Sequence, residues 1–124
     1  MLSNMGFFGD IWDALVEGIM GIWRMCVKVV KAVVNFFSDI FNWLKDLLED
    51  DDDKDAFVVD WAAMVEEAKK QGTVDIGLKK KKGVGTGLYD PNTRSITDFK
   101  SIDADARDSK TDEVLGGRRL VIVE

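Results

Sequence analysis

The stretch Phe7–Glu49, FFGDIWDALVEGIMGIWRMCVKVVKAVVNFFSDIFNWLKDLLE, carries its apolar residues in a heptad pattern. Two positions of the heptad are apolar in almost every repeat, which is typical of a helix that buries one face against a neighbour. These residues are, in chain order, Phe8, Trp12, Leu15, Ile19, Ile22, Cys26, Val29, Val33, Phe36, Ile40, Trp43 and Leu47. The pattern predicts a long amphipathic helix over residues 1–49.

Polar residues in the same stretch recur three or four positions apart, as one side of a helix requires. Because this stripe keeps its phase, we expect one helix of about 40 residues, or consecutive helical pieces with the same face inward. Gly18–Gly21 is the predicted place for a break, since each glycine costs a helix interior about 1 kcal/mol relative to alanine.

The heptad positions beside the core series are also largely apolar. They add Trp23, Val30, Phe37 and Leu44 to the predicted interface. A two-stranded coiled coil carries charged residues at these flanking positions, so the pattern excludes a simple zipper. We therefore expect the first segment to contact neighbours on more than one side.

The chain after this segment reads as an acidic linker followed by a small α+β domain. The linker is residues 50–54, and the domain is residues 55–124. Asp55 is the predicted cap of a second helix over residues 55–71, which Gly72 ends.

From residue 73 the apolar period changes to two, which predicts strands at about 73–78, 84–90, 95–99 and 118–123. Pro91 and Asn92 supply a hairpin turn, and a short helix before Gly116 is expected in the polar stretch that starts at Asp103. The expected fold class is α+β, with a small, mainly antiparallel sheet.

The composition excludes several functional classes. Among 124 residues there are 17 basic and 23 acidic ones, and the net charge of -6 argues against a general nucleic-acid binder. The chain has no histidine, the commonest general base and transition-metal ligand, and its one cysteine cannot form an intramolecular disulfide. We therefore expect no enzymatic activity, no cofactor and no metal site.

Two further motifs have the composition of binding sites. The glycines of GVGTG, at 83, 85 and 87, lack the spacing of a dinucleotide or phosphate loop and indicate a closely packed strand. The basic cluster Lys79, Lys80, Lys81 and Lys82 could contact an acidic surface or anionic lipid. The alternative for this cluster is a solvated strand edge that discourages pairing.

The sequence shows neither a recognisable secretory signal nor an ordinary membrane-spanning run. A signal peptide would carry a basic residue near its start, but none precedes Arg24. A membrane-spanning run would be nearly free of charge, but Arg24, Lys28 and Lys31 interrupt the apolar stretch. These observations leave the localisation undetermined.

The apolar surface of the first segment decides the functional prediction. A bare helix of this kind would expose an apolar patch far larger than soluble monomers show. We therefore expect a non-enzymatic structural subunit whose partners are other protein chains, above all copies of itself, in an oligomer or filament. One alternative is a membrane-associated protein that places the same helix at a lipid interface or lines a pore. A second is a monomeric binding module, in which the segment breaks and folds back on the second helix and sheet.

Overall fold

The structure is a computed structural model that describes residues 2–50, 53–70 and 82–123, with the backbone alone at 2–8, 19, 20 and 23. It contains the helices α1 (Leu2–Glu17), α2 (Ile19–Met25), α3 (Asn42–Asp50), α4 (Trp61–Lys70) and α5 (Ser109–Leu115), and a π-helical turn η1 (Phe36–Phe41). The strands are β1 (Val27–Val34), β2 (Asp55–Asp60), β3 (Val84–Asp90), β4 (Ser95–Arg107) and β5 (Leu120–Val123). The predicted α+β class is confirmed.

The strands form one five-stranded sheet in the order β1-β4-β3-β2-β5. β1 is parallel to β4, and the remaining neighbours are antiparallel. Within β1–β4 the register places Val27 beside Lys100 and Val30 beside Asp103. The sheet is thus mainly antiparallel, as predicted, but one edge is a parallel pair that joins the first and last thirds of the chain.

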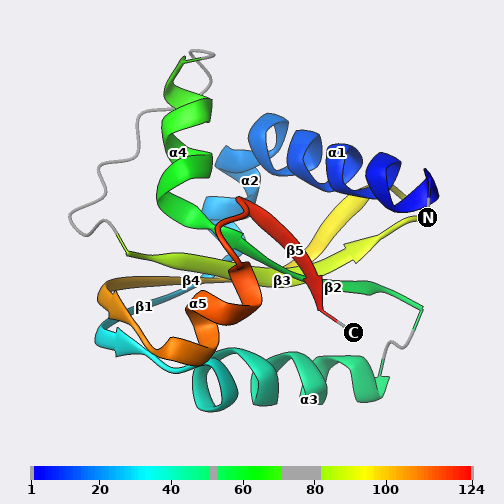
Figure 1. The fold of residues 1–124 in the computed structure, drawn as a ribbon. Helices are drawn as coiled ribbons and strands as arrows, with labels where there is room; N and C mark the ends of the chain where they lie inside the picture. The colour runs from blue at the N-terminus through cyan, green and yellow to red at the C-terminus, as the bar shows by residue number, and fades with distance from the viewer. Residues whose placement is uncertain (1, 51–52, 71–81, 124) are drawn as a thin grey trace.

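Helices cover both faces of the sheet, as Figure 1 shows: α1, α2 and α4 lie on one side, and α3 and α5 on the other. The core under α1 and α4 contains Ile11, Leu15, Trp61 and Phe99. The opposite core contains Phe36, Ile40 and Leu44 packed on sheet residues such as Ile102. Both cores therefore combine residues from 1–49 with residues from 55–124.

The predicted continuous helix over residues 1–49 is wrong. The segment instead runs through α1, α2, β1, η1 and α3. The first break is at Gly18, inside the predicted Gly18–Gly21 interval, where a Cβ atom would lie 2.8 Å from the carbonyl oxygen of Ala14. The stretch VKVVKAVV then forms β1, because its β-branched valines favour a strand and a partner strand is available.

The alternative in which this segment breaks and folds back on the rest of the chain agrees with the observed fold. The helical course ends at Cys26, whose backbone is extended, and β1 ends at Asn35, which is extended with φ -109° and ψ 124°. The heptad spacing thus arises from core positions on several short elements.

The predicted helix over 55–71 is only partly correct. Residues Asp55–Asp60 form β2, and α4 begins at Trp61. Asp60, and not Asp55, caps the helix, since its Oδ1 accepts a hydrogen bond from the Ala63 backbone N–H at 3.2 Å. The run AFVVD is buried over most of its length, which a central strand between β3 and β5 explains.

The other predicted strands lie close to their expected positions. β3 covers the predicted 84–90, β5 lies within 118–123, and β4 starts at Ser95 but continues to Arg107, beyond the predicted end at residue 99. The predicted strand at 73–78 lies outside the described residues. The short helix closed by Gly116 is confirmed as α5, with Gly116 in the left-handed conformation.

Candidate interaction surface

The structure divides the residues predicted as an assembly interface between the two cores and an exposed strip. Buried in the cores are Leu15, Ile22, Cys26, Phe36, Ile40 and Leu44. Partly buried are Trp12, Val29, Trp43 and Leu47. Val30, Val33 and Phe37 are exposed. The side chains of Phe8, Ile19 and Trp23 lie outside the described residues.

The predicted basic cluster is described only at Lys82. This residue is exposed at the start of the β3 segment, and its carbonyl oxygen accepts a hydrogen bond from Arg107 Nε at 3.1 Å. Lys79, Lys80 and Lys81 lie outside the described residues.

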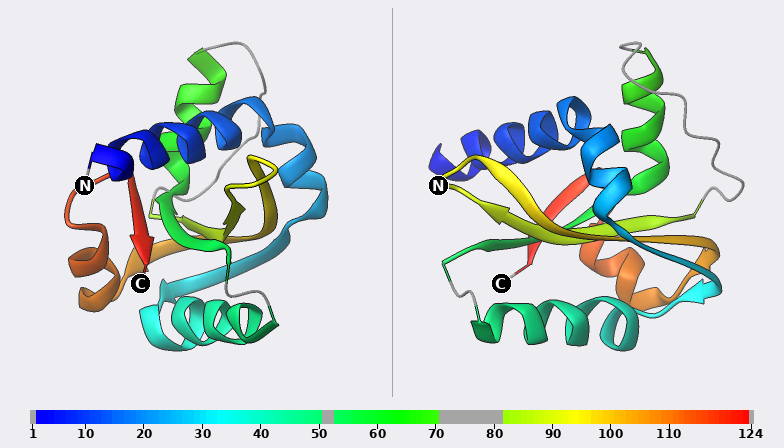
Figure 2. Two further views of the ribbon diagram at one scale, coloured as in Figure 1. Left: turned by 90° about the vertical axis from the view of Figure 1, so that its right-hand side faces the viewer. Right: turned by 180° about the vertical axis from the view of Figure 1, so that it is seen from behind.

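The exposed strip lies on β1, an edge strand of the sheet. Val27, Val30 and Val33 are 50%, 71% and 42% exposed. Within residues 2–50, 53–70 and 82–123, no strand pairs with the outer side of β1. The right-hand panel of Figure 2 shows β1 running from α2 along the near side of the sheet. We call Val27, Val30 and Val33 the β1 edge surface.

The turn η1 is fixed to β1 by a buried carboxylate. Asp39 is 8% exposed, and its oxygens accept hydrogen bonds from Lys31 Nζ at 2.7 Å and from the Asn35 backbone N–H at 2.8 Å. Its backbone carbonyl accepts a further bond from Lys100 Nζ, which also lies 5.7 Å from the Trp43 ring centroid. Burial lowers the pKa of Lys100, an effect that the Asp39 carboxylate partly offsets.

A second carboxylate joins η1 to α5. Asp108 caps α5 by accepting hydrogen bonds from the backbone N–H of Thr111 at 2.9 Å and from its hydroxyl. The other Asp108 oxygen accepts from the Phe36 backbone N–H at 3.1 Å. Burial raises the pKa of Asp108, but these three hydrogen bonds outweigh it and hold the pKa below the ordinary value. The end of β1 and the start of η1 are thereby held against the end of β4.

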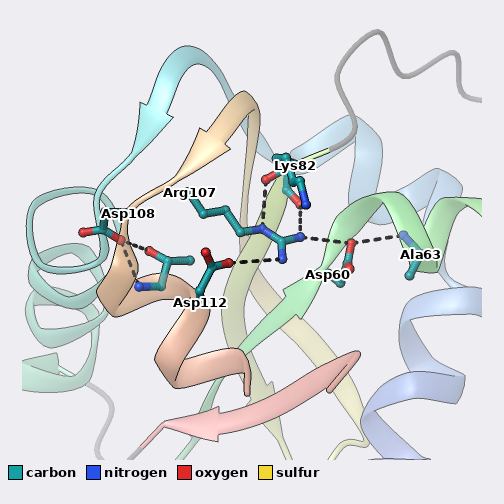
Figure 3. Close-up of polar contacts among 8 residues, drawn as sticks. Asp60, Ala63, Lys82, Arg107, Asp108 and Asp112 are labelled. Carbon is teal, nitrogen blue, oxygen red and sulfur yellow. Dashed lines mark hydrogen bonds and ion pairs between the residues drawn. The ribbon is translucent and has the colours of Figure 1, made fainter. Parts of the chain in front are cut away.

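Arg107 forms a cluster of charged residues with Asp60 and Asp112 beside α5 and pairs with both. Figure 3 shows the Arg107 guanidinium between Asp60 and Asp112, with nitrogen–oxygen distances of 3.3 and 3.9 Å. The same side chain donates to the carbonyl oxygens of Lys82 and Gly83. Because every acid here already pairs with a cation or a backbone N–H, the cluster offers no free general base.

The surface also has open hollows, two of which are candidate ligand sites. One of about 500 Å³ is lined by Gly9, Trp12, Arg118, Arg119 and Leu120, and the Arg119 guanidinium lies 4.5 Å from the Trp12 ring centroid. Another of about 340 Å³ between α3 and the sheet is lined mainly by apolar residues. The second hollow carries Lys45 and Glu49 among its lining residues, one turn apart on α3. Burial raises the pKa of the Cys26 thiol, which disfavours a nucleophilic thiolate.

The described residues hold no group of three acidic, cysteine or histidine side chains placed to ligate a metal ion. Within the same residues, each helix is too short or too polar to cross a membrane. No family model, curated protein or solved structure matches this chain.

Sequence reasoning missed the two carboxylates that position the β1 edge surface. Asp39 stands off the polar stripe of the heptad pattern and next to the core residue Ile40. A charged residue at such an off-pattern position is a signal for a buried, paired acid. Asp108 precedes Thr111 and a run ending at Gly116, which is the spacing of a capped helix.

Proposed function

We propose that this chain is a non-enzymatic subunit that self-associates by strand pairing at β1. The observation that carries the proposal is the exposure of Val27, Val30 and Val33 on an edge strand of eight residues. An exposed edge presents unpaired N–H and C=O groups that another strand can bind. Apolar side chains on that edge add hydrophobic burial when a second strand pairs with it.

β1 has few of the features by which natural proteins prevent edge pairing. Such edges are usually very short, or carry proline, bulges or projecting lysines. β1 has no proline and pairs with β4 through most of its length. Of its two lysines, Lys31 is held by Asp39, whereas Lys28 is exposed. Lys28 is therefore a feature of this edge that disfavours pairing, and the valines of the strand favour it.

The fold also removes much of the basis for the membrane alternative. That alternative required the apolar residues of the first segment to face lipid along one helix. Leu15, Ile22, Phe36, Ile40 and Leu44 are instead buried in the cores. Among the side chains that the structure describes, the large exposed apolar ones lie mainly on β1 and η1, and strand pairing accounts for those of β1.

The proposal is tested by the mass of the full chain in solution. We expect the wild-type protein to associate at micromolar concentration by light scattering, and Val30→Lys to shift it toward monomer. The substitution places a charge at the most exposed valine of the edge. We expect a loss of at least about tenfold in association constant, which corresponds to about 1.4 kcal/mol.

The matched control is Phe37→Ser, which removes an exposed apolar side chain on η1, outside the strand β1. Its mass distribution should equal that of the wild type, and circular dichroism should show that both variants are folded. A wild-type protein that stays monomeric up to high micromolar concentration contradicts the proposal.

A further inference from the structure

We infer that two copies pair antiparallel through β1 in one register, with Val30 of one copy beside Val30 of the other. This inference rests on the proposed function and deepens it by naming the partner and the geometry. The partner is a second copy of this chain. The product is a closed dimer in which one continuous sheet runs through both molecules.

Symmetry limits the registers that such a dimer can adopt. In a two-fold dimer each contact occurs twice, with the roles of the two copies exchanged. For antiparallel strands, one residue must then face its own copy at the axis, and residues equally far on either side must face each other. Among the eight residues Val27–Val34, only an axis at Val30 or at Lys31 leaves no more than one residue unpaired.

Charge decides between these two axes. An axis at Lys31 sets this lysine directly opposite its own copy, and like charges at directly opposed positions are destabilising. An axis at Val30 places Lys31 opposite Val29 and Lys28 opposite Ala32. No lysine then faces a lysine, so the Val30 axis is favoured.

The positions of the exposed valines are symmetric about the same axis. Val27 and Val33 are three residues to either side of Val30, and an axis at Val30 therefore pairs Val27 with Val33 of the second copy. Because side chains alternate along a strand, these pairs lie on one face and the Val30 pair on the other. Each exposed valine of β1 thus faces another valine, Val27 beside Val33 on one face and Val30 beside Val30 on the other, as a self-complementary edge requires.

The other edge of the sheet explains why we expect a closed dimer. β5 has four residues, against eight in β1. A filament would need β1 of each copy to pair with β5 of the next, since head-to-tail contacts generate open chains. Such a contact would leave half of β1 unpaired and its valines without the partners described above.

The register is tested by disulfide cross-linking of the full-length chain, with Cys26→Ala as the background so that the introduced thiol is the only one. We expect Val30→Cys to form a covalent dimer under mild oxidation. Directly opposed residues have Cβ atoms about 4.5–5.5 Å apart, close to what a disulfide requires.

The matched control is Ala32→Cys, which is exposed and lies on the same face of β1. In the inferred register it is offset from its own copy by four residues, or about 13 Å, so we expect about tenfold less dimer than with Val30→Cys. An equal mixture of Ala32→Cys and Lys28→Cys should give the mixed dimer, because those residues face each other.

The outcomes separate the inference from the proposed function. Association with preferential cross-linking of Ala32→Cys or Lys31→Cys overturns the Val30 axis but keeps self-association at β1. Masses that grow without limit as concentration rises overturn the closed dimer. Absence of any association overturns both.

Discussion

At the residue scale, Asp39 fixes η1 to β1 through the bonds that its side chain accepts from Lys31 and from the Asn35 backbone. We expect Asp39→Asn to lower the free energy of unfolding by about 1–3 kcal/mol, because hydrogen bonds to a charged, buried group are lost or weakened and Lys31 loses its partner. Urea unfolding followed by circular dichroism measures the change. Asp46→Asn, at an exposed position on α3, is the control and should change stability by less than about 0.5 kcal/mol. Equal effects of the two substitutions would show that Asp39 does not stabilise η1.

Asp108 should contribute a pH-dependent part of the stability. Its pKa in the folded protein is lowered from the ordinary value of 3.8. A depressed carboxyl pKa stabilises the fold above that ordinary value, and the contribution is lost as pH falls through the lower, folded pKa. Asp108→Asn should therefore flatten the fall in stability below about pH 4, and loss of the charged cap should cost about 1 kcal/mol at neutral pH.

The measurement for Asp108 is thermal unfolding of both proteins between pH 2 and pH 7, at steps of about half a unit. Asp112→Asn on α5 serves as the comparison because Asp112 is largely exposed and its ion pair with Arg107 spans 3.9 Å. If the stability of the wild type and of Asp108→Asn fell in parallel over the acid range, Asp108 would not be the source of the pH-dependent stability.

At the level of elements, the glycines of β3 are explained by close approach of the neighbouring strand. A Cβ atom at Gly87 would lie 2.1 Å from the carbonyl oxygen of Asp98, and backbone cannot move aside as a flexible side chain can. We expect Gly87→Ala to destabilise the protein by more than about 2 kcal/mol, at the upper range of single substitutions.

Gly21→Ala is the matched test for Gly87→Ala. Gly21 lies within α2, where an added Cβ atom meets nothing within 4 Å. The same chemical change should there raise stability by about 0.5–1 kcal/mol, because alanine favours a helix. Chemical denaturation of both variants decides the matter, and a mild effect at Gly87 would contradict the packing described.

The elements also show which parts of the fold the sequence could predict. α5 and the β3–β4 hairpin were predictable because their signals are local: Gly116 ends the helix, and the Asp90 side chain accepts from the Asn92 backbone N–H in the turn. β1 was not, because VKVVKAVV satisfies the helical apolar spacing as well as strand preference. Its partner β4 lies far along the chain, and no local pattern reports such a pairing.

The same reason explains the partial prediction of the candidate surface. Val30 and Val33 were identified as apolar residues in need of a neighbour, but the surface on which they lie depends on β1 being at an edge of the sheet. Val27 was absent from the predicted interface since it stands outside the selected heptad positions. Only the sheet order places it with the other two valines.

At the scale of the whole molecule, each of the two cores contains residues from both 1–49 and 55–124. We therefore predict that neither part folds without the other. A fragment of residues 53–124 would lose the residues of α1, η1 and α3 that cover both faces of the sheet. Its strands would then expose the residues that these helices bury. We expect this fragment to lack cooperative thermal unfolding, in contrast to the full chain.

Near-ultraviolet circular dichroism and proton–nitrogen correlation spectra of the fragment and the full chain provide the measurement. A dispersed spectrum from the fragment would contradict the shared-core description. Residues 1–50 alone serve as the reciprocal control and should also be unfolded, because β1 and α3 pack on strands from the later part of the chain.

The parallel pairing of β1 with β4 also sets an order of events during synthesis. β1 leaves the ribosome well before its partner residues Lys100–Arg107 are made. Until then both sides of this valine-rich strand are unpaired, and contacts between residues so distant in sequence slow folding. Neighbouring nascent chains on one message hold identical strands close together at that stage. The strand edge that we propose for dimerisation is therefore also exposed to aggregation in the interval before β4 is made.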